Sequence, residues 1–135
     1  MRRKRNFSRS DAGSTSIEFA FSILPVLVMI FLTIEIVSAA YTFEVLSEAA
    51  NEGVRYAIVR STDTTLVSDT TSVVDNYAGL SRHNMSNLSV SVSLPDGQTI
   101  PGRVEVSISY PYAPWVHFLT NPPTMQAYAE GRLVY

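Results

Sequence analysis

An apolar segment near the N-terminus constrains this chain more than any other feature. The residues from Phe19 to Ile34 include no charged side chain, and Glu35 is the only charge between them and Ala40. A helix needs about 20 mostly apolar residues to cross the ~30 Å hydrocarbon core of a bilayer. The strictly uncharged part has only 16 residues, and Pro25 removes one helical hydrogen bond within it. We nevertheless expect residues 14–40 to form a membrane-spanning helix.

The distribution of charge predicts how this helix is oriented. Of the ten Lys and Arg residues, five lie in the first nine positions, and the next basic residue after them is Arg55. Basic residues collect on the cytoplasmic side of membrane helices, so the N-terminus is predicted to be cytoplasmic and the C-terminal part periplasmic or extracellular. The remainder of the chain, from Asp11 onward, is acidic, with five basic residues against twelve acidic ones. This balance excludes a typical nucleic-acid-binding domain.

A secretory signal peptide is the alternative interpretation of the same segment. Ser38, Ala39 and Ala40 are small enough for a cleavage site, which would release a protein beginning at Tyr41. The apolar run is longer than the hydrophobic region of an ordinary signal peptide, and the helical pattern continues through the supposed cleavage site. Both observations favour an anchor that stays in the membrane.

The helical pattern continues beyond the membrane over residues 41–60. Ala49, Gly53 and Ala57 recur every four residues and place three small side chains on one face, here called the small-residue face. Such a face allows another element to approach closely, either from the protein's own sheet or from another subunit. We therefore expect one helix from Ile17 to Val59.

A second four-residue period forms an acidic ridge on the same helix. It consists of Glu44, Glu48 and Glu52, with Arg55 one turn beyond the last of them. Like charges at this spacing repel weakly, and Arg55 offsets part of the repulsion. A solvated helix face explains the ridge; a contact with a basic partner subunit is the alternative.

Residues 61–135 are predicted to form a small head of mixed helix and strand. A short helix is expected over residues 69–79, and apolar and polar residues alternate strictly over 88–94 and 104–110. Turn residues between the two alternating segments predict an antiparallel hairpin, and a third strand is expected over 126–135. Prolines at 111, 114, 122 and 123 are expected to keep residues 111–124 out of a central strand. The fold class is therefore α+β, a long N-terminal transmembrane helix extending into a head with a three-stranded antiparallel sheet.

The residue types that usually carry catalysis or bind metals are sparse. The chain has no cysteine, and its two histidines, His83 and His117, are far apart with no acidic residues at ligand spacing. No nucleotide-binding or hydrolase motif is present. We expect neither a cofactor nor a metal site, and no enzymatic activity.

Aromatic residues gather near the prolines that follow the second expected strand. They are Tyr110, Tyr112, Trp115 and Phe118. A small core beneath the sheet accounts for such a cluster; an exposed surface for a partner or a carbohydrate is the alternative.

The residues just before the apolar segment contain the most informative motif. Gly13 separates the basic leader from the helix, and Glu18 follows it by five residues. Thr15 and Glu18 have the spacing of a capping box, which by itself explains an acidic residue in a first helical turn. The glycine and the carboxylate together with a basic leader and an apolar helix form a more specific pattern.

This pattern resembles the class III signal of type IV pilin-like proteins. Glu18-Phe19-Ala20 and Pro25 follow Gly13 in the apolar run, and residues 48–57 (EAANEGVRYA) are similar to a segment of the TadE-like family. Members of that family are minor pseudopilins of the tight-adherence (Flp) pilus. Phe19 stands where Flp-type proteins often have tyrosine. The similarity covers about residues 9–60.

The resemblance implies a pilin-like fold and a specific processing event. A prepilin peptidase would cut between Gly13 and Ser14, removing a leader of residues 1–13. Glu18, followed by Phe19, would then pair with the freed N-terminal ammonium of a neighbouring subunit. The implied partners are the membrane lipid, the prepilin peptidase, a TadF-type minor pseudopilin, the major Flp pilin and the inner-membrane assembly platform.

Two other functions are compatible with parts of the pattern. One is a signal-anchored envelope protein whose head binds a ligand or polysaccharide independently of any pilus. The other is an enzyme secreted after cleavage at Ala40. The mature N-terminus distinguishes them, because Ser14, Tyr41 and Met1 each correspond to a different interpretation.

Overall fold

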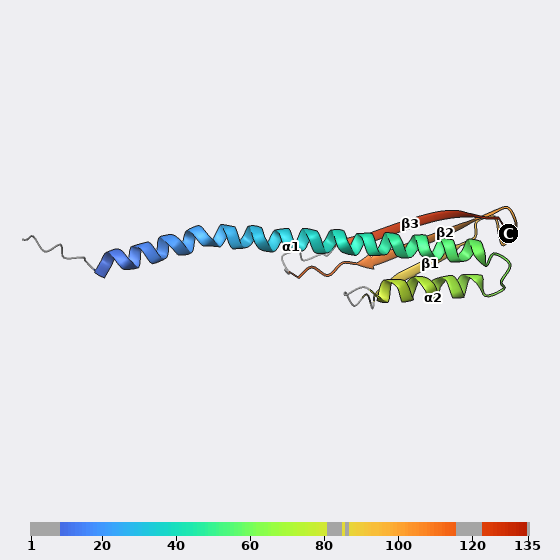
Figure 1. The fold of residues 1–135 in the computed structure, drawn as a ribbon, viewed down its shortest axis with the longest axis horizontal. Coiled ribbons are helices and arrows are strands. Elements are labelled where there is room, and N and C mark those ends of the chain that lie inside the picture. Colours follow the sequence, from blue (N-terminus) through green and yellow to red (C-terminus); the bar gives the residue numbers. More distant parts are fainter. Residues whose placement is uncertain (1–8, 81–84, 86, 116–122, 135) are drawn as a thin grey trace, which may run out of the picture. The chain divides into compact units, whose positions relative to one another are not determined.

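The chain contains two helices followed by three strands. A computed structural model describes residues 9–80, 85, 87–115 and 123–134. The elements are α1 (Arg9–Val59), α2 (Leu66–Gly79), β1 (Ser89–Ser93), β2 (Gly102–Pro111) and β3 (Thr124–Leu133), shown in Figure 1. The α+β class, the long N-terminal helix and the three-stranded antiparallel sheet are all as the sequence predicts.

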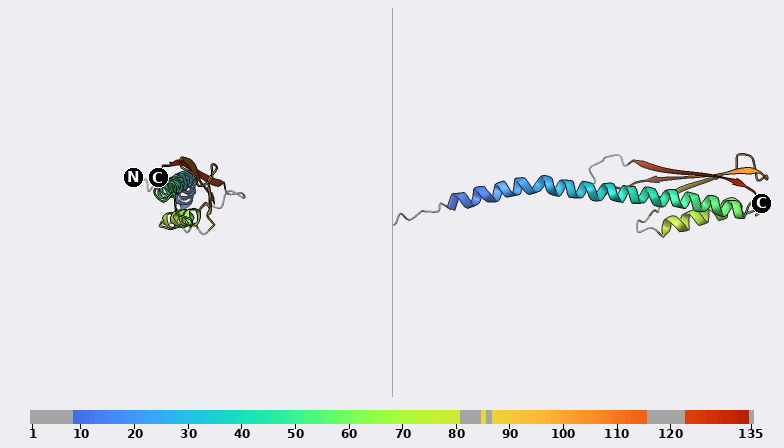
Figure 2. Two further views of the ribbon diagram at one scale, coloured as in Figure 1. Left: turned by 90° about the vertical axis from the view of Figure 1, so that its right-hand side faces the viewer. Right: turned by 45° about the horizontal axis from the view of Figure 1, so that its top comes forward.

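The chain divides into two units, which are described separately. The first ends at Ile36 and includes the N-terminal part of α1. The second, residues 37–135, contains the rest of α1 and every other element, and we call it the folded unit. Within it, α2 and the C-terminal part of α1 run side by side along the sheet (Figures 1 and 2).

The sheet has the order β1-β2-β3, with both neighbouring pairs antiparallel. Val90 lies opposite Ile108 in the β1–β2 pair, and Val106 opposite Ala129 in the β2–β3 pair. Because side chains alternate across a strand, this register puts the valines of β1, the even-numbered residues of β2 and the alanines of β3 on one face. That face is covered by the helices, while the serines and charged residues of the strands face outward.

The core of the folded unit lies between this sheet face and the two helices. Leu46 and Ala50 of α1, Leu66 and Val74 of α2, and Val104 and Val106 of β2 are among its buried residues. An amphipathic helix buries residues three and four apart, and α2 does so with Leu66, Thr70, Val74 and Ala78. Burial of this apolar area is the main source of stability.

The element boundaries correct the sequence predictions in four places. α1 begins at Arg9 rather than Ile17, so Gly13 lies inside the helix and Thr15 does not cap its N-terminus. α2 begins at Leu66, one turn earlier than expected. β3 occupies Thr124–Leu133 instead of 126–135.

The fourth correction concerns a proline. Pro111 is the last residue of the central strand β2 and pairs with Thr124, although residues 111–124 were expected to stay outside such a strand. Proline lacks a donor, but at the last position of a strand this removes little of the ladder.

Candidate functional site

The residues around the expected cleavage point are helical and exposed. Gly13 and Ser14 lie within α1, and both are accessible to solvent. A Cβ added to Gly13 would have no described atom within 4 Å beyond the backbone of its own helix. Its φ is not positive, since Gly97 is the only described residue with a positive φ. The packing of the described residues therefore does not require glycine at position 13.

Glu18 presents an exposed carboxylate one turn after Ser14. Its backbone carbonyl accepts a hydrogen bond from the Ser22 hydroxyl at 2.9 Å. Among the described residues, no basic side chain forms an ion pair with Glu18. Phe19 beside it is also exposed. The carboxylate is thus available to a cation from outside the described chain.

The apolar part of α1 is long enough to cross a membrane. The candidate span lies within Gly13–Val59, and its most apolar 18-residue window is not buried in the protein at all. Two hydroxyls in this part are bonded within the helix, Ser22 to the Glu18 carbonyl and Thr33 to the Met29 carbonyl at 2.8 Å. Hydroxyl groups satisfied in this way are tolerated in a hydrocarbon environment.

The small-residue face is buried within the folded unit. Ala49 and Ala57 are fully buried, and Gly53 lies between them. A Cβ on Gly53 would lie 2.5 Å from Val74 Cγ2 of α2 and 3.6 Å from Val106 Cγ1 of β2. The chain's own helix and sheet thus occupy this face, which leaves no room there for a helix of another subunit.

The acidic ridge remains at the surface. Glu44 and Glu48 are exposed, and Glu52 is half-buried. Arg55 Nη1 lies 3.6 Å from Glu52 Oε2, and the two side chains are 76% and 42% exposed, respectively. Exposed pairs of this kind contribute about 0–1 kcal/mol. The ridge has the properties of a solvated helix face.

The aromatic cluster is divided between the core and the surface. Tyr110 and Tyr112 are buried, and the Tyr112 amide donates to the Pro123 carbonyl at 3.2 Å. Trp115, in contrast, is 71% exposed. Phe118 and both histidines lie outside the described residues. Among the residues that the structure does describe, no group of three or more acidic or histidine side chains could hold a metal ion.

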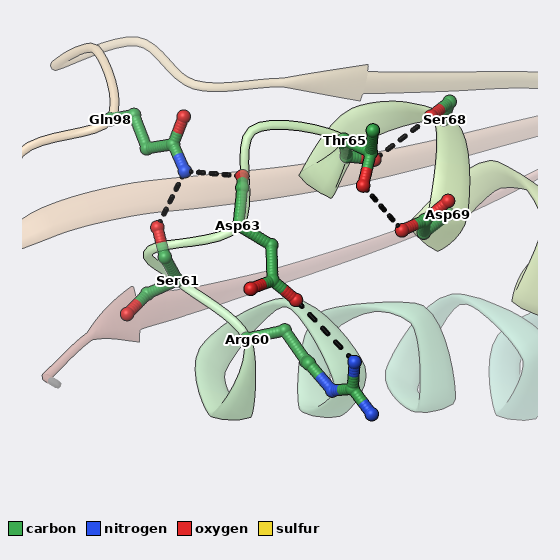
Figure 3. A network of polar contacts seen from close by, with 7 residues as sticks. All are labelled: Arg60, Ser61, Asp63, Thr65, Ser68, Asp69 and Gln98. Atoms are coloured by element: carbon green, nitrogen blue, oxygen red, sulfur yellow. Dashed lines mark hydrogen bonds and ion pairs between the residues drawn. The ribbon is translucent and has the colours of Figure 1, made fainter.

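A polar network that the sequence did not indicate joins two connections of the folded unit (Figure 3). The side-chain amide of Gln98, between β1 and β2, donates to the carbonyls of Ser61 and Asp63 at 2.7 Å each. Asp63 also pairs with Arg60 at 3.5 Å. Gln98 is more than 30 residues from both Ser61 and Asp63 in the sequence, so only the fold brings it to them. A glutamine in a turn-rich segment carries no sequence signal for such a contact.

An ion pair on the β1–β2 connection was also missed. Arg103 Nε donates to Asp96 Oδ2 at 2.9 Å, and its Nη2 donates to Oδ1 at 3.3 Å. This hydrogen bond with Arg103 holds the pKa of the Asp96 carboxyl below its ordinary value. The Pro-Asp-Gly sequence predicts a turn here, and the pair with Arg103 fastens that turn to the first residues of β2.

Comparison with known proteins identifies the N-terminal part of the chain. Residues 13–55 match the family model described as TadE-like protein, in agreement with the resemblance in the sequence. No curated protein and no solved structure matches the chain. A TadE-like segment indicates a component associated with the tight-adherence (Tad) pilus, and its apolar helix indicates a membrane anchor.

Proposed function

We propose that this chain, whose residues 13–55 are TadE-like, is a minor pseudopilin of a tight-adherence pilus. It would act as a structural component of pilus assembly, held in the bacterial inner membrane by α1, with no catalytic activity. The N-terminus would be cytoplasmic and the folded unit periplasmic or extracellular. The observation that carries this proposal is the family match, which begins at Gly13 and continues through the exposed apolar helix.

The environment of Gly13 supports a role in processing. A glycine inside a helix costs about 1 kcal/mol relative to alanine. Gly13 is helical, has a negative φ and has no close neighbour among the described residues, so the fold gives no compensation for that cost. Recognition by a prepilin peptidase that cuts between Gly13 and Ser14 would account for it. Residues 1–13 would then be a leader peptide.

The position of Glu18 supports a role in subunit docking. It lies next to the uncharged stretch that begins at Phe19, where a carboxylate is costly unless it is paired. Cleavage after Gly13 would create an ammonium group on Ser14 of each subunit. Glu18 of one subunit would pair with Ser14 of its neighbour, which would align the two helices. The neighbour would be the TadF-type pseudopilin or the major Flp pilin, delivered at the assembly platform.

Replacing Glu18 by alanine in the pilus-forming cell tests this function. We expect surface pili and adherence to fall severalfold, because the docking charge is lost, while the protein remains in the membrane fraction. Glu48→Ala is the matched control, since Glu48 is an exposed carboxylate of the same helix on the acidic ridge. Unchanged pilus number and adherence in Glu18→Ala cells would contradict the proposal and favour an envelope protein unrelated to pili.

A further inference from the structure

Three exposed aromatic side chains of the folded unit come from two segments that are distant in the sequence. Tyr41 and Phe43 lie on α1, just after the apolar stretch, and Trp115 follows β2. All three expose about half or more of their surface, and Trp115 exposes 71%. Exposed apolar side chains that gather in one place mark an interaction surface.

The packing of α1 on the sheet places these three residues at the same end of the folded unit. Gly53 of α1 approaches Val106 of β2, which pairs with Ala129, while Gly131 of β3 approaches Val54 and Ile58. Residue numbers on β3 therefore increase in the same direction as those on α1, as Figure 1 also shows.

The lengths of β3 and α1 then show which residues of the two elements lie at the same level. From Gly131 back to Thr124 the strand spans roughly 23 Å at ~3.3 Å per residue, which equals about 15 residues of helix at ~1.5 Å each. This brings the start of β3 to the level of Tyr41 on α1. Pro111 pairs with Thr124, and the Tyr112 amide reaches the Pro123 carbonyl, so the segment leading to Trp115 begins at this level as well.

This end is also where the folded unit is joined to the apolar stretch, because Val37 follows Ile36 directly. Tryptophan and tyrosine favour the membrane–water interface, where the ring is apolar and the polar atom meets water. The helix between Phe19 and Tyr41 is about 33 Å long at ~1.5 Å per residue, close to the thickness of the hydrocarbon core.

We propose that this end of the folded unit is a lipid-contacting surface, with Trp115 in the headgroup layer beside Tyr41 and Phe43. The inference rests on the membrane anchoring in the proposed function and adds a second attachment, distant in sequence from the span. The contact depends on apolar insertion of these three aromatic side chains. It should therefore persist at high salt.

Trp115 is the only tryptophan of the chain, so its fluorescence tests the inference directly. The full chain is placed in nanodiscs of phosphatidylethanolamine and phosphatidylglycerol, which leave both faces of the bilayer open to the buffer. We expect lipids brominated near the headgroup to quench Trp115 severalfold more strongly than dissolved iodide does. Strong iodide quenching without lipid quenching would overturn the inference. Protection from both quenchers would overturn it too, because it would mean that another protein copy covers the residue.

Two variants that introduce tryptophan at another position serve as controls, and each is made in a Trp115→Phe background. Val59→Trp places the probe at the end of α1, at a position that is 70% exposed, and iodide should quench it without any effect of brominated lipid. Tyr41→Trp reports on the anchor itself and should be quenched by lipid. Lipid quenching at position 41 but not at Trp115 would refute this inference and leave the anchor intact. Absence of lipid quenching at position 41 would refute the membrane anchor and with it the proposed function.

Discussion

At the scale of single residues, the two glycines of the TadE-like segment have different physical explanations. Gly53 is buried where α1 meets α2 and β2, and its lack of a side chain is what allows the close approach. Gly13 has no such neighbour among the described residues. A sequence pattern treats both as motif positions, but only the structure shows that one is needed for packing. Gly13 then requires an explanation other than packing.

Gly53→Ala should therefore destabilise the folded unit. The added Cβ would lie 2.5 Å from Val74 Cγ2, and Val74 is fully buried and β-branched, so it cannot move aside easily. Overpacking of this kind costs about 1–3 kcal/mol. Urea unfolding of the full chain in detergent, followed by circular dichroism, measures the change. Gly79→Ala is the matched control, because the space around Gly79 is open, and it should leave the midpoint nearly unchanged.

A double variant separates overpacking from a general loss of structure. Val74→Ala removes the methyl groups that the new Cβ would meet. Gly53→Ala should then cost less in the Val74→Ala background than in the native one, because the two positions are in contact. Equal costs in both backgrounds would show that the close approach seen at Gly53 does not limit its substitution.

At the scale of elements, the sequence predicted what depends on local pattern and missed what depends on distant contacts. The alternating valines and serines specify both strands of the hairpin, and the apolar run specifies the helix. The start of α1 at Arg9 was missed because Gly13 and the apparent capping box suggested a later beginning. The small-residue face was recognised, but whether another subunit or the chain itself fills it could only be decided by the position of α2.

Gln98 illustrates a contact that local pattern cannot reveal. Its amide joins the α1–α2 connection to the β1–β2 connection through two carbonyls. Gln98→Ala should destabilise the folded unit by about 1 kcal/mol, a typical net value for hydrogen bonds of this kind. Gln98→Glu should be worse, since its carboxylate would face two carbonyl oxygens. Thermal unfolding measures both variants, with Thr64→Ala in the neighbouring exposed turn as control. Native stability of Gln98→Glu would show that this contact contributes nothing.

At the scale of the whole molecule, one helix combines three properties. α1 carries a glycine that the packing of the described residues does not require, an exposed carboxylate and an apolar stretch long enough to span a bilayer. Its C-terminal part is instead built into the core of the folded unit. A helix divided in this way suits a subunit that docks through its N-terminal part and presents a separate folded surface.

The mature N-terminus tests this account most directly. The full chain is expressed with an active prepilin peptidase or with a catalytically inactive variant of it, and the membrane-bound product is sequenced from its N-terminus. We predict a sequence beginning at Ser14 with the active peptidase, Met1 with the inactive one, and loss of processing in Gly13→Leu. A product beginning at Tyr41, released from the membrane, would contradict the account.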